Sequence, residues 1–140
     1  MLDKTALILV SVLTASLMLS ASTAAAEIPA QCRILSTGEW EASVNVQQSG
    51  PAKLIVLGEV ETVTGGYEVT LERDETALNP ALVTLDLNVV PPPADAMVSQ
   101  MITPHAVKAE VPEVSRDLKR VVINCGGEKL MEITEISVLN

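Results

Sequence analysis

The chain has 140 residues and a net charge of −9 at neutral pH. Such a surface repels the phosphates of nucleic acids and anionic lipids, so both are disfavoured as partners. Phenylalanine is absent, and Trp40 and Tyr67 are the only large aromatic residues. This composition excludes a binding platform made of several stacked rings.

Residues 1–26 have the composition of a secretory signal peptide. Lys4 supplies a short positive region, an apolar run follows it, and Ala24-Ala25-Ala26 matches the small residues that a signal peptidase accepts. We therefore expect cleavage after Ala26 and one domain over residues 27–140. An uncleaved membrane anchor is the alternative, because about 20 residues span a bilayer.

The two cysteines lie near the two ends of this domain. An even number of cysteines in an exported chain indicates a disulfide, and neither belongs to a CxxC pair typical of a metal site. We expect a structural bridge between Cys32 and Cys125. The residues before Cys32 lack the small residue that lipid attachment needs. We therefore expect no lipid anchor, and a location in a bacterial periplasm or outside the cell.

Alternating apolar and polar residues predict strands through the first half of the domain. The first contains Trp40, Ala42, Val44 and Val46 and places Trp40 in the core. Lys53–Glu61 is rich in Leu, Ile and Val and reads as a central strand. Gly65-Gly66 then predicts a tight turn, because glycine adopts positive φ angles, and a hairpin with the strand from Tyr67 to Glu72.

The alternation of apolar and polar residues continues through the second half of the domain. Pro91-Pro92-Pro93 ends one strand, since proline donates no ladder hydrogen bond, and Ala94–Thr103 is left open between a short helix and an edge strand. Gly126-Gly127 predicts a final hairpin, with a bulge between Leu130 and Ile136. The strands expected here are Val83–Val89, Val107–Val111, Arg120–Cys125 and Glu128–Val138.

Roughly seven or eight short strands with regular turns predict an all-β domain. We expect two packed antiparallel sheets in an immunoglobulin-like sandwich. A small closed barrel is the alternative.

Catalytic chemistry is weakly supported. His105 is the only histidine and is expected in a solvated loop, so no Ser-His-Asp group is predicted. Three carboxylate pairs are expected to be solvated and to act only in solubility: Glu39/Glu41, Glu59/Glu61 and Asp74/Glu75. Four residues of an acidic loop match no calcium-binding spacing: Glu72, Asp74, Glu75 and Asn79.

These observations predict a non-catalytic, exported binding or structural accessory domain of the bacterial cell envelope, without a cofactor. The expected partner is another envelope or secreted protein. Two surfaces are candidates: the Glu61–Tyr67 turn, where Tyr67 would contact the partner, and the Pro91–Pro112 edge. The alternative is a periplasmic copper carrier, because Met97, Met101 and His105 recur every four residues, and thioether and imidazole groups suit copper.

Overall fold

The computed structural model describes residues 27–46, 50–76 and 79–140. The predicted signal peptide, residues 1–26, lies outside the described residues. All regular secondary structure in the described part of the chain is β-strand. Accordingly, these residues include no helix long and apolar enough to cross a membrane.

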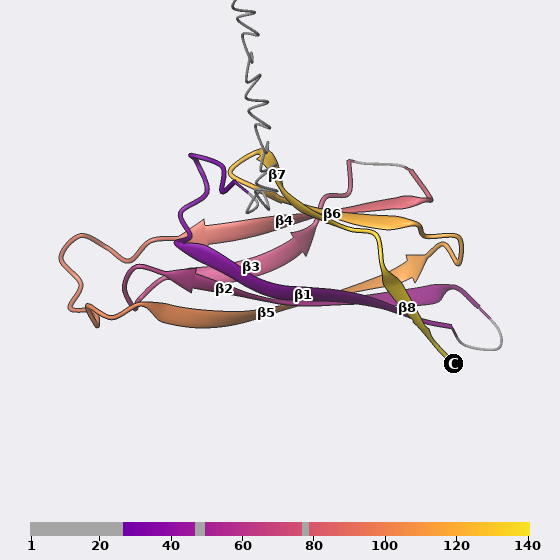
Figure 1. Ribbon diagram of the computed structural model, residues 1–140, viewed down its shortest axis with the longest axis horizontal. Helices are drawn as coiled ribbons and strands as arrows, with labels where there is room; N and C mark the ends of the chain where they lie inside the picture. The colour runs from indigo at the N-terminus through magenta and orange to yellow at the C-terminus, as the bar shows by residue number, and fades with distance from the viewer. Residues whose placement is uncertain (1–26, 47–49, 77–78) are drawn as a thin grey trace, which may run out of the picture.

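The strands of the described residues form two four-stranded sheets that pack against each other (Figure 1). This arrangement confirms the predicted two-sheet sandwich, and the closed barrel is wrong because both sheets keep free edges. The first sheet, in the order β5-β2-β1-β8, consists of β1 (Ser36–Asn45), β2 (Ala52–Thr62), β5 (Thr103–Val114) and β8 (Ile136–Leu139). The second, in the order β3-β4-β6-β7, consists of β3 (Glu68–Arg73), β4 (Leu82–Val90), β6 (Arg120–Cys125) and β7 (Glu128–Ile133).

The expectation of wholly antiparallel sheets is wrong. β1 and β8 are parallel, and so are β4 and β6, whereas the other neighbours are antiparallel. The chain leaves the second sheet after β4, forms β5 in the first sheet, and returns as β6. Two reversals of direction bring β6 back parallel to β4.

The predicted hairpin across Gly65-Gly66 is also wrong. β2 and β3 lie in different sheets and are not paired with each other. The connection between them carries the chain from one sheet to the other, and β3 pairs with β4 instead. By contrast, the hairpin at Gly126-Gly127 is confirmed: β6 pairs with β7, and both glycines have positive φ angles of 63° and 83°.

The last predicted strand, Glu128–Val138, is two strands. The register of β6 and β7 shifts at Leu130, which confirms a bulge there. After Ile133 the chain crosses to the first sheet and forms β8 (Figure 1). The irregular alternation in this part of the sequence reflects that change of sheet, because residues on the two sides of the crossing face different neighbours.

The core lies between the sheets and is almost wholly aliphatic. Every second residue of a strand points inward, so Leu54, Val56 and Val60 of β2 face Leu85 of β4 and Ile123 of β6; all five are fully buried. Trp40 is half-buried and packs against this cluster. Cys32 and Cys125 form the predicted disulfide, with Cα atoms 5.1 Å apart.

Replacing Asp86 with asparagine is expected to stabilise the fold at neutral pH. Asp86 lies on the outer face of β4, directly opposite Glu72 of β3. Partial burial, and then the charge of Asp74, raise the pKa of Asp86 above its ordinary value of 3.8. The folded state therefore favours the protonated acid, and its ionised form destabilises the fold once the pH exceeds the folded pKa. Removing the repulsion between the like charges of Asp86 and Glu72 should raise the free energy of unfolding by about 0.5 kcal/mol.

Urea unfolding of the wild type and of Asp86→Asn at pH 7 and at pH 3 measures this effect. The stabilisation should disappear at the lower pH, where both the folded and the unfolded carboxyl groups are protonated. A variant less stable than the wild type at pH 7 would contradict the expectation.

Candidate functional site

Two connections that are far apart in the sequence meet at one end of the sandwich. They are the Val63–Tyr67 connection between β2 and β3, and the connection between β4 and β5, residues 91–102 (Figure 1, left end). The amide of Gly65 donates a 2.9 Å hydrogen bond to the carbonyl of Ser99. The two surfaces expected separately from the sequence therefore form one continuous surface.

Gly66 explains why these connections pack so closely. Its φ is 83°, in the left-handed region that favours glycine. A Cβ atom at this position would overlap the side chain of Val98 and approach Pro92 at 3.0 Å. The absence of a side chain at Gly66 lets the proline-containing connection lie directly on the β2–β3 connection, and this contact holds both in place.

Large apolar side chains are exposed at this end. Met97 is fully exposed and Met101 is 71% exposed, while Val63, Val90 and Ile102 are at least half exposed. Continuing the β2–β5 register beyond Thr62 and Thr103 places Val63 opposite Ile102. We call these five residues the apolar tip. Gathered apolar groups on a protein surface mark sites of interaction more often than scattered ones do.

The surroundings of the apolar tip are mainly acidic. Residues 54–72 and 74–107, which include both connections, contain no lysine or arginine. Glu68 and Asp95 are exposed beside the tip. Arg33, on the N-terminal segment, is a basic residue that lines a shallow hollow with Val90.

The sequence left the segment after Pro93 open between a helix and an edge strand, and it is neither. Residues 94–102 run as an irregular connection, and β5 begins at Thr103. Without a helix, the four-residue spacing does not place Met97 and Met101 on one helical face. His105 is not in a solvated loop either: it is half-buried on β5, opposite Val60 of β2.

The hydrogen bonds of His105 define its tautomer. Its Nε2 atom lies 2.9 Å from the hydroxyl oxygen of Thr62, and that hydroxyl donates to the carbonyl of Thr64 at 2.7 Å. A hydroxyl has one proton to donate, so Thr62 must accept from His105, and Nε2 carries the hydrogen. In the neutral ring the lone pair is then on Nδ1, which has no hydrogen-bond partner among the described residues.

The remaining sequence candidates are more dispersed. Tyr67 is half-buried just before β3 and is not part of the buried core. Asp74 accepts hydrogen bonds from the hydroxyl and the amide of Thr76, which lower its pKa; the Asn79 side chain accepts from the amide of Ala81. Within the described residues, no group of three or more His, Cys, Asp or Glu side chains is arranged to hold a metal ion.

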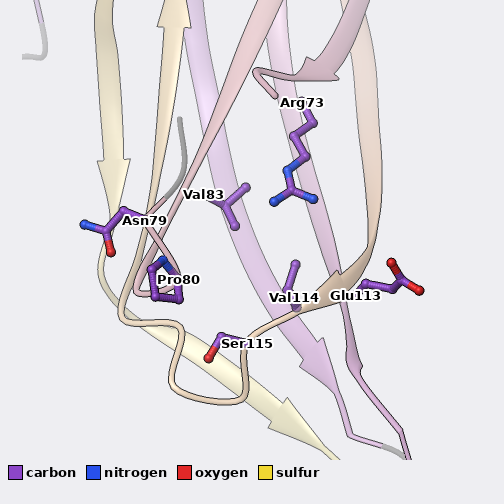
Figure 2. Close-up of a pocket in the computed structure, with 7 residues that line it drawn as sticks. All are labelled: Arg73, Asn79, Pro80, Val83, Glu113, Val114 and Ser115. Carbon is purple, nitrogen blue, oxygen red and sulfur yellow. The ribbon is translucent and has the colours of Figure 1, made fainter. Parts of the chain in front are cut away.

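The opposite end of the sandwich has a hollow of about 410 Å³. Figure 2 shows the Arg73 guanidinium directed toward Val83 and Val114, whereas the carboxylate of Glu113 points away. Glu113 has a φ of 58°, unusual for a residue with a side chain. It lies at a register shift between β2 and β5, so this backbone turn directs Glu113 outward and returns Val114 to the core. The hollow thus presents one guanidinium above an apolar floor.

Comparison with known proteins adds no relative: no family model matches the sequence, and neither a curated protein nor a solved structure is significantly similar to it.

Proposed function

We propose that the protein is an exported, non-catalytic binding accessory that docks through its apolar tip onto another envelope or secreted protein. The observation that carries this proposal is the exposure of Met97 and Met101 on a surface built from two connections that brace each other. The complementary partner surface is an apolar pocket bordered by lysine or arginine, because the acidic groups at the tip attract basic ones.

The construction of the tip favours binding. Its two connections are already held together by the Gly65–Ser99 hydrogen bond and the close contact at Gly66, so little further ordering is needed when a partner binds. Methionine side chains are flexible and polarisable and adapt to irregular apolar surfaces. A rigid base with adaptable side chains suits a docking element.

The disulfide supports the export part of the proposal. Disulfides persist in oxidising compartments and are rare in the cytosol. The Cys32–Cys125 bridge is compatible with the apolar-to-small pattern of residues 1–26, which predicts a signal peptide.

Replacing Met97 and Met101 with serine is expected to abolish docking and to leave the fold intact, since neither side chain is buried. Burying one methionine stabilises a complex by about 1.5 kcal/mol or more, so each substitution should weaken binding at least about tenfold. The wild type and the double variant are compared by affinity capture from extract of the native compartment, followed by a titration with the purified partner.

The matched control is Val138→Ser with Leu139→Ser, which removes two exposed apolar side chains from β8 instead. The control should bind the same partner as the wild type. Retention of that partner by the Met97 and Met101 variant at undiminished affinity would overturn the proposed use of the tip.

A copper carrier is the second candidate, and the tautomer of His105 favours it. The lone pair on Nδ1 is free to bind a metal, and Met101 lies two residues before β5, on which His105 is found. A competition titration with Cu(I) tests this function. A dissociation constant below about 1 μM that is lost in His105→Ala would support it; no binding at that level would dispose of it.

A further inference from the structure

One edge of the first sheet is only half covered. β8 pairs with Ala42–Asn45 of β1, and no other described strand neighbours residues 36–41 on that side. The amide of Val46 donates to the carbonyl of Leu139, so the even-numbered residues of β1 from Trp40 onward, beyond the register shift between Thr37 and Trp40, direct their main-chain groups toward the β8 side. By this alternation the amide and carbonyl of Trp40 point to the open edge.

The side chain of Trp40 lines a groove beside this edge. Its ring lies on Gly58 of β2, where a Cβ atom would overlap three ring carbons. A hollow of about 680 Å³ is bounded by the ring, by Leu57 and by Met131 of β7. A second hollow of about 430 Å³ shares Trp40 and Met131 and continues toward Ser137 of β8.

The indole nitrogen of Trp40 has an unmet hydrogen bond. Nε1 is buried and has no acceptor among the described residues. Indole is a donor only, and a buried donor without a partner destabilises the fold.

Carboxylates border both hollows. Glu39, Glu41 and Glu59 line the first hollow, while Glu132 and Glu135 line the second. Glu132 is paired with Arg120 and Lys129. The side chains of the other four have no ion-pair or hydrogen-bond partner in the described part of the chain, so unpaired negative charge borders the groove.

We propose that the open half of β1 binds an extended, lysine- or arginine-containing segment of a partner polypeptide as an added strand. The segment would pair with the free main-chain groups at Trp40, place an apolar side chain against Trp40 and Met131, and direct its cationic side chains to Glu39 and Glu41. Strand addition gains affinity from the main chain and specificity from alternate side chains. This surface is distinct from the apolar tip.

The probe is a capped octapeptide of alternating lysine and valine. It is added to the full-length protein, and the fluorescence emission of Trp40, the protein's single tryptophan, is followed. We expect a saturable change in Trp40 emission, weakened by salt because the contacts are between charges. Two further peptides test the geometry: one has glutamate in place of lysine, and one has alternate amides N-methylated. Neither should bind.

Glu39→Gln combined with Glu41→Gln should weaken binding of the lysine peptide about tenfold. The matched control, Glu68→Gln combined with Glu75→Gln, removes the same charge elsewhere and should bind as the wild type does. Met97→Ser with Met101→Ser should also bind the peptide normally, so this proposal and the docking of the apolar tip can fail separately.

Four results would overturn the inference. They are the absence of a saturable change up to about 1 mM lysine peptide, equal binding of the glutamate peptide, equal binding of the N-methylated peptide, and self-association of the chain through this edge, detected by sedimentation.

Discussion

Replacing Cys32 and Cys125 with alanine is expected to lower the free energy of unfolding by about 3–5 kcal/mol. The bridge spans 93 residues of sequence, and closing so long a loop removes much of the conformational freedom of the unfolded chain. In the folded state it ties the N-terminal segment to the end of β6. A hydrogen bond also ties this N-terminal segment to a strand, because the amide of Leu35 donates to the carbonyl of Glu61 in β2.

Urea unfolding of the wild type and of the double alanine variant measures the loss. The wild type unfolded in reducing agent is the matched control, because it breaks the same covalent bond without changing the residues. Both should be destabilised by similar amounts. A loss below about 1 kcal/mol in the double variant would mean that the rest of the fold already restrains the N-terminal segment.

Most of the strands were predictable because they bury one face, whereas β8, which has no buried residue, was not predicted as a separate strand. In β5, the buried Val107, Ala109 and Val111 alternate with exposed neighbours, and that period of two can be read from the sequence directly. The disulfide was predictable from composition, because the chain has two cysteines and residues 1–26 predict export to an oxidising compartment.

Strand pairing was less predictable, as the two diglycine turns demonstrate. Both glycines at Gly126-Gly127 have positive φ angles, the backbone that a two-residue hairpin loop needs, whereas only Gly66 does at Gly65-Gly66. The residue types are identical in the two turns. The difference comes from contacts with Ser99, Val98 and Pro92, which are remote in sequence.

The candidate sites depend on the same kind of non-local information. The sequence placed Trp40 in the core, and its phase on β1 is indeed inward, yet it is only half-buried because β8 stops short of it. Met97 and Met101 were singled out for their spacing, but their exposure follows from the irregular path of the β4–β5 connection. No local sequence pattern predicts the length of β8 or the path of the β4–β5 connection.

Replacing Gly58 with alanine is expected to destabilise the fold by about 2–3 kcal/mol. The new methyl group would occupy the space of the Trp40 ring, so the ring must leave its position against β2 and lose its contacts with the core. Urea unfolding measures the stability, and a shift of tryptophan emission to longer wavelength reports the exposure of the ring. Gly65→Ala is the matched control: its Cβ would make an ordinary contact with Ser99 at 3.4 Å.

A double-mutant cycle separates this steric cause from a backbone effect. In a Trp40→Ala background the ring is gone, so Gly58→Ala should no longer be destabilising and should instead gain about 0.5–1 kcal/mol, since alanine restricts the unfolded chain more than glycine does. Circular dichroism follows unfolding in these variants, which lack tryptophan. If Gly58→Ala costs as much without the ring as with it, the overlap with Trp40 is not the cause. The groove would then not depend on a glycine at this position.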